Sequence, residues 1–180
     1  MKIAILVLAF LSLSACKEQH DLRKHEVYRI LNEIFRDDST FLPIVCAQLT
    51  KLPVRGEWNK EFTDEDRSFI ADQQELFKDF KIDSSELKFY SGKYKKFIPV
   101  KVISDCKGHN NIVYRLSFPF IAIDRTKVVL EVIEDCNCML GGHGGKYLFI
   151  KEQNHWKRTK SYGYYISSYS SKDGKPTSAR

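Results

Sequence analysis

Two stretches of the chain repeat apolar residues every three or four positions, which is the period of an amphipathic helix. The second follows Thr63, which stands in a cap position with acidic residues in the next turn and Asp66 in capping-box position. We expect this helix to continue to Lys81. The first stretch covers residues 21–38 and places these side chains on one face: Leu22, Val27, Ile30, Leu31 and Ile34.

Beyond Phe97 the pattern changes to short apolar runs separated by polar turns, which predicts strands. Short connections favour antiparallel neighbours. The run at residues 128–133 is apolar on both parities, so we expect a central strand covered on both faces. The fold class expected is therefore α+β, with N-terminal helices packed on a C-terminal antiparallel β-meander. The predicted strands are 98–104, 112–118, 127–134, 146–151 and 156–161, with 164–167 continuing the last.

Two other segments are distinctive. Residues 41–49 are too apolar to be exposed and contain Pro43, so they predict a buried connector or a short helix. In residues 87–101, aromatic side chains alternate with lysines. This pattern predicts either a half-exposed strand pair, whose lysines prevent the sheet edge from pairing with another chain, or a groove for an anionic polymer or head group.

The N-terminus has the pattern of a secretory signal. Lys2 precedes an apolar run at residues 3–13, and small residues follow before Cys16. The run is about half of the roughly 20 residues that a membrane-spanning helix needs, so we expect it to be removed rather than to span.

The motif Leu13-Ser14-Ala15-Cys16 resembles the lipobox of bacterial lipoproteins. The resemblance implies cleavage after Ala15, a thioether from Cys16 to diacylglycerol, and an acyl chain such as palmitate on the new amine. Two or three chains would anchor the protein durably in a membrane. The alternative is a plain secretory signal with Cys16 an ordinary cysteine.

The lipobox, together with the length and composition of the rest of the chain, predicts a domain layout and a location. The layout is a signal peptide at 1–15, a lipidated tether at 16–21, one globular domain at 22–169 and a flexible polar tail at 170–180. The location is the cell envelope, at the outer membrane on its periplasmic or surface face.

Four further motifs are spread over the rest of the chain: Phe62-Thr63-Asp64-Glu65-Asp66 with Gln73, Ser117-Phe118-Pro119-Phe120, Gly141-Gly142-His143-Gly144-Gly145-Lys146-Tyr147-Leu148, and Trp156. With these motifs the chain resembles a loose group of uncharacterised bacterial lipoproteins, a resemblance that implies no known activity. The chain departs from that group by His143 among the glycines and by two cysteines ahead of them.

Four cysteines follow Cys16, an even set that predicts disulfides in an oxidising compartment. A direct link from Cys136 to Cys138 would be strained. We therefore expect each of them to bond a distant cysteine, with Cys106 favoured as partner of one and Cys46 closing a long loop.

Composition adds limits to the class of partner. The 180 residues are 43% hydrophobic and 13% aromatic, which is typical of a globular chain with its own core. The net charge of +6 is a modest excess that can hold a domain near anionic head groups. For an exported lipoprotein we expect no nucleic-acid partner, while a protein partner in the envelope is compatible with the sequence.

One group of residues could hold a metal. Cys136, Cys138 and His143 could bind zinc or copper, with Cys106 or His109 as a fourth ligand. The alternative is a pair of disulfide cysteines beside a loop with a solvent-facing histidine, and we expect no cofactor.

No familiar catalytic motif is present in the sequence. There is no Gly-x-Ser-x-Gly elbow and no His-Glu-x-x-His pair. The tyrosines Tyr162, Tyr164 and Tyr165 could line a recognition patch or belong to a core or sheet edge. The function expected is a non-catalytic binding or interaction module, such as an immunity or inhibitor protein. The rival is a metal-binding protein or metal-dependent enzyme.

Overall fold

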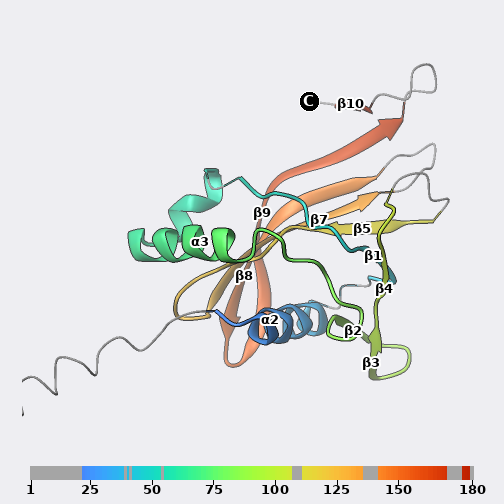
Figure 1. Ribbon diagram of the computed structural model, residues 1–180, viewed down its shortest axis with the longest axis horizontal. Coiled ribbons are helices and arrows are strands. Elements are labelled where there is room, and N and C mark those ends of the chain that lie inside the picture. The colour runs from blue at the N-terminus through green and yellow to red at the C-terminus, as the bar shows by residue number, and fades with distance from the viewer. Residues whose placement is uncertain are drawn as a thin grey trace, which may run out of the picture.

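The protein has an α+β fold, as the sequence predicts. In this computed structural model, a mixed eight-stranded sheet is combined with helices and a separate two-stranded hairpin (Figure 1). The structure describes residues 22–38, 40, 42–53, 55–106, 111–135, 142–169 and 176–178.

The helices of the described chain are α2 (Lys24–Asp37), the 3-10 helix η1 (Glu57–Glu61) and α3 (Asp64–Leu76). The strands are β1 (Ile44–Cys46), β2 (Lys88–Ser91), β3 (Lys96–Pro99), β4 (Lys101–Ile103), β5 (Val113–Leu116), β6 (Phe120–Ile121), β7 (Lys127–Asp135), β8 (His143–Glu152), β9 (His155–Tyr169) and β10 (Pro176–Ser178).

The main sheet is mixed because one strand from the first half of the chain enters it in parallel. The order is β10-β9-β8-β7-β5-β1-β4, with β6 pairing with β7. Strands β7, β8 and β9 are antiparallel neighbours, whereas β1 pairs in parallel with both β4 and β5. The segment at 41–49, expected to be a connector or short helix, therefore contains a strand. Its central residue Val45 is fully buried.

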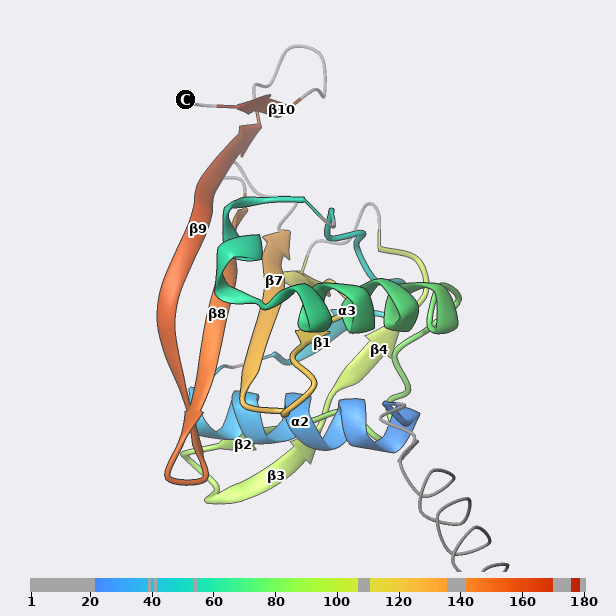
Figure 2. The same cartoon turned by 90° about the vertical axis from the view of Figure 1, so that its left-hand side faces the viewer.

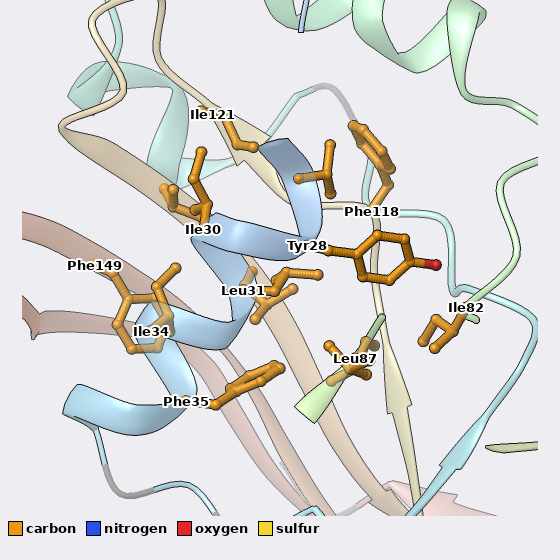
Figure 3. Close-up of a cluster of buried hydrophobic side chains, with 14 of the residues drawn as sticks. Tyr28, Ile30, Leu31, Ile34, Phe35, Ile82, Leu87, Phe118, Ile121 and Phe149 are labelled. Atoms are coloured by element: carbon orange, nitrogen blue, oxygen red, sulfur yellow. The ribbon is translucent and has the colours of Figure 1, made fainter. Parts of the chain in front are cut away.

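Helix α2 covers one face of the sheet and confirms the first predicted helix. Tyr28, Ile34 and Phe35 point from it into the larger hydrophobic cluster. Ile34 lies beside Phe149 of β8, and Tyr28 lies beside Phe118 (Figure 3). The Tyr28 hydroxyl also accepts a hydrogen bond from the backbone N–H of Asp83 at 2.8 Å. The helix thus joins the sheet to the segment that leads into β2.

Helix α3 and η1 cover the opposite face, over a second cluster that includes Trp58, Ile70, Val129 and Leu148. The predicted capping box is present: Thr63 Oγ1 accepts from the Asp66 N–H, and Asp66 accepts from the Thr63 N–H. Because Asp66 fixes the first turn, the start of α3 is readable from the sequence.

Helix α3 ends at Leu76, five positions before the predicted end at Lys81. The chain turns there, and the ring centres of Phe77 and Phe80 lie 5.1 and 5.6 Å from the ring centre of Phe118. The apolar residues beyond Leu76 thus pack around another aromatic ring instead of extending a helical stripe.

Strand β7 is the central strand that the sequence predicts. It lies between β5 and β8. Val128 and Leu130 belong to the cluster under α2, and Val129 belongs to the cluster under α3; all three are fully buried. Burial on both faces explains why this strand lacks the alternation of a one-sided strand.

A disulfide joins Cys46 to Cys106, so the expectation that Cys106 bonds Cys136 or Cys138 is wrong. The parallel pairing of β1 with β4 places Cys46 opposite Ile103. Cys106 follows Ile103 by one short turn, within bonding distance of Cys46. The bond closes a loop across 60 positions of sequence.

Candidate functional site

The sheet-end cluster consists of Tyr114, Glu134, His143 and Tyr164, which come from four adjacent strands. Glu134 of β7 lies opposite both Tyr114 of β5 and His143 of β8, so all three side chains share one face. The Tyr114 hydroxyl donates to Glu134 Oε2 at 3.1 Å, and Glu134 Oε1 is 3.4 Å from His143 Nδ1. The ring centre of Tyr164 lies 6.1 Å from that of His143.

Burial gives the members of this cluster different roles. Burial, together with the nearby Glu134 carboxylate, raises the pKa of Tyr114 to about 12, so this tyrosine remains a hydrogen-bond donor at neutral pH. Tyr164 is 58% exposed, and Ile166 beyond it is also 58% exposed. The cluster therefore combines an inner hydrogen-bonded pair with an outer aromatic and apolar surface. Such a surface suits contact with another molecule.

His143 is the member of the proposed metal group that the structure describes. A carboxylate beside a histidine can orient the ring for a ligand or a proton. The described residues contain no group of three or more histidine, cysteine or acidic side chains that could hold a metal ion. Cys106, one candidate for the fourth ligand, is used in a disulfide. Cys136, Cys138 and His109 lie outside the described residues.

The three tyrosines proposed for recognition have different surroundings. Tyr162 is 7% exposed, and its hydroxyl donates to Glu61 Oε1 at 2.8 Å. Burial, and then this bond, raise the pKa of Tyr162 above its usual value. Tyr162 thus links β9 to η1, while Tyr164 faces solvent. The Tyr165 side chain lies outside the described part of the chain.

Sequence reasoning missed a buried acid on the face under η1. Glu131 is 8% exposed; it accepts from Thr50 Oγ1 at 3.1 Å and lies 3.3 Å from Lys146 Nζ. Lys146 Nζ is also 5.4 Å from the ring centre of Trp58. The available signal was a single acid inside the apolar run at 128–133. The pairing of Glu131 with Lys146 became visible only from the register of β7 and β8.

Comparisons with family models, with curated proteins and with solved structures found no match to this chain.

A second exposed surface is the hairpin of β2 and β3, which forms its own sheet. The alternation of lysines and aromatics at 87–101 thus corresponds to a strand pair, one of the two predicted alternatives. Tyr94 at the turn is 58% exposed and Phe97 is 42% exposed. Within the described residues, the side-chain ammonium groups of this hairpin form no ion pair.

The residue predicted to carry the lipid, Cys16, lies outside the described residues, as do the rest of the signal and the tether. Among the helices that the structure describes, none is long and apolar enough to cross a membrane.

Proposed function

We propose that this protein is a lipid-anchored lipoprotein of the cell envelope that acts as a non-catalytic binding module. The observation that carries the proposal is the motif Leu13-Ser14-Ala15-Cys16 directly after an apolar leader. It supplies a cleavage site with small residues and the one nucleophile, a thiol, that accepts the diacylglyceryl group. A folded domain attached in this way remains at the membrane, where its partner is an envelope protein.

The arrangement of the acids supports a binding role. Glu33 and Asp66 accept hydrogen bonds from other segments of the chain, and Glu61 holds Lys160 and Tyr162. These carboxylates therefore have structural partners. The exposed end of the sheet instead presents Tyr164 and Ile166, side chains that gain by being covered.

Mass spectrometry of the chain extracted from native membranes tests the anchor. We expect a mature chain that begins at Cys16 and carries diacylglycerol and an acyl chain. Cys16→Ser should leave an uncleaved or unlipidated chain that is lost from the detergent-extracted membrane fraction. A native chain with an unmodified Cys16 would remove the anchor from the proposal.

The alternative function is a metal-binding protein or metal-dependent enzyme that uses Cys136, Cys138 and His143. The observation in its favour is the Glu134 carboxylate beside His143, an arrangement that orients metal-bound histidines. Metal analysis of the same membrane preparation, with a count of free thiols, separates the two functions. Stoichiometric metal with two free thiols supports the alternative, and a metal-free chain removes it.

A further inference from the structure

We infer that the β2–β3 hairpin is a membrane-contacting element that docks the domain on an anionic lipid surface. The inference deepens the proposed function, because it assigns a second contact between this chain and the membrane. The contact requires no lipid on Cys16, so the two proposals can be tested separately.

The two faces of the hairpin differ in polarity. Phe89 and Ile98 pair across the strands and pack into the cluster under α2. The next pair, Tyr90 with Phe97, lies on the opposite face, with ring centres 5.6 Å apart. The inner pair fixes the hairpin to the domain, and the outer pair leaves an aromatic surface toward solvent.

Two hydrogen bonds hold the base of the hairpin to α2. Asn32 Nδ2 donates to the carbonyl of Glu86 at 2.9 Å, and the Lys88 N–H donates to Asn32 Oδ1 at 2.8 Å. A two-stranded sheet is marginally stable by itself. These bonds and the buried Phe89 therefore make the hairpin a fixed projection of the domain.

The charge of the hairpin is entirely positive. Residues 88–99 contain four lysines and no acid, although the chain as a whole has 29 basic and 23 acidic residues. All four lysines are exposed. Elsewhere in the described chain lysines often pair with acids, as Lys151 does with Glu33 and Lys160 does with Glu61. Within the described residues the hairpin lysines pair with no acid, although Lys93 Nζ lies 5.3 Å from the ring centre of Tyr94, so their charges are available to an external anion. The four are Lys88, Lys93, Lys95 and Lys96.

Lysine together with aromatic side chains fits a lipid surface better than a single phosphate or a nucleic acid. The hairpin contains no arginine, the residue that recognises phosphate in bidentate geometry. Lysines act as point charges toward a surface of anionic head groups. Tyrosine and phenylalanine rings are suited to the boundary between head groups and acyl chains.

The hairpin lies at one end of the molecule, and a short tether would hold the domain close to the membrane. Both views place β2, β3 and α2 at one end of the molecule, with β10 at the other (Figures 1 and 2). Six residues, 16–21, separate the proposed lipid from Leu22. A fully extended chain of that length spans at most about 20 Å, which keeps the domain close to the bilayer. Tethering at that distance raises the effective concentration of the surface that the hairpin meets.

Vesicle binding by the unlipidated chain, residues 17–180, tests the inference. This chain contains every residue that the structure describes, including both hydrophobic clusters and the disulfide. We expect it to bind phosphatidylcholine vesicles containing phosphatidylglycerol at least about tenfold more tightly than vesicles of phosphatidylcholine alone. The triple variant Lys93→Gln, Lys95→Gln, Lys96→Gln should lose at least about tenfold of this binding.

A control variant has the same change in net charge elsewhere. Lys51→Gln, Arg55→Gln, Lys60→Gln removes three exposed cations from the segment around η1. We expect it to change vesicle binding by less than about threefold. Equal losses in the two triple variants would show that net charge alone drives binding and would overturn the inference. So would equal binding of the original chain to the two kinds of vesicle.

The aromatic residues separate a lipid from any other polyanion. Tyr94→Ser with Phe97→Ser should remove the vesicle binding that persists at high salt. Salt screens the attraction between the lysines and the head groups, whereas the two rings insert between head groups and acyl chains and are not screened. Binding to polyglutamate as tight as to anionic vesicles, and unchanged by this double variant, would identify an acidic protein surface as the partner and overturn the lipid assignment. Unchanged unfolding midpoints in the variants ensure that the comparison concerns folded protein.

Discussion

Asp66 shows how one side chain can be both local and long-range in its effect. Its Oδ2 accepts from the Thr63 N–H at 3.1 Å, which closes the capping box, and its Oδ1 accepts from the Ile123 N–H at 2.9 Å. Burial by itself would raise the pKa of Asp66, but the hydrogen bonds from Ile123 and Thr63 outweigh burial and lower it. The charged form of this carboxyl is therefore stabilised by folding.

Asp66→Asn should lower the free energy of unfolding at neutral pH by about 1–3 kcal/mol, since two N–H groups lose a charged acceptor. The variant should also change the response to acid. A carboxyl whose folded pKa lies below its ordinary 3.8 stabilises the fold above that value and loses this contribution as pH falls through the folded pKa. The free energy of unfolding, measured by denaturant titration at a series of pH values, should therefore fall less steeply between neutral pH and about pH 2 for the variant than for the original chain. Asp72→Asn, an exposed change on α3, is the control. An acid profile that does not change in Asp66→Asn would contradict this role.

The half of this residue's role that is encoded locally could be predicted from the sequence. Thr63 and Asp66 are three positions apart, so the capping box is visible as a motif. Ile123 lies 57 positions from Asp66, and no local pattern indicates that bond. The same limit applies to the sheet-end cluster. His143 was identified as a candidate, but Glu134 and Tyr114 join it only through strand register.

At the level of elements, α2 is fixed to the end of the sheet through Glu33. Its Oε2 accepts from Lys151 Nζ at 2.9 Å and from the Trp156 indole N–H at 3.1 Å. Burial would raise the pKa of Glu33, but the bonds from Lys151 and Trp156 prevail and lower it. Glu33 thus joins a helix near the N-terminus to both strands of the β8–β9 hairpin.

Glu33→Gln should reduce the free energy of unfolding by about 1–3 kcal/mol, because Lys151 loses its counter-charge and the Trp156 indole loses a charged acceptor. Chemical denaturation followed by tryptophan fluorescence measures the loss. The exposed Asp79→Asn should stay within about 0.5 kcal/mol of the original chain. Equal stability of Glu33→Gln and Asp79→Asn would show that apolar packing alone holds α2.

The elements that the sequence predicts best are those whose whole signal is local. Helix α2 has a complete apolar stripe, and β7 has a long run that is apolar on both parities. Strand β1 has only three residues, and its partners β4 and β5 lie far along the chain. An apolar run of that length predicts burial but neither the type of element nor its neighbours. The mixed character of the sheet therefore became apparent only in three dimensions.

On the scale of the whole molecule, the Cys46–Cys106 disulfide joins the first part of the fold to its middle. Strand β1 contributes three residues to the sheet, and the covalent bond holds its end beside β4. A crosslink that closes a long loop removes conformations from the unfolded chain and so stabilises the fold.

The double variant Cys46→Ser, Cys106→Ser should lose about 2–4 kcal/mol of unfolding free energy, and hydrogen exchange should become faster in β1 and β4 before the rest of the sheet. Each single variant should lose about as much as the double variant, because each breaks the same bond. Denaturant unfolding with hydrogen exchange detected by mass spectrometry measures both effects. A double variant as stable as the original chain would show that β1 is held by its hydrogen bonds and packing alone.

Strand β1 is synthesised well before its two neighbours in the sheet, β4 and β5, so it cannot pair as soon as it leaves the ribosome. At a synthesis rate of about 5–20 residues per second, the roughly 70 residues between Val45 and Tyr114 take about 4–14 s to emerge. For most of that interval the apolar strand Ile44–Cys46 lacks both of its neighbours, because β4 is synthesised only shortly before β5. The sheet on this side of the domain can therefore close only after the chain has been made as far as β5.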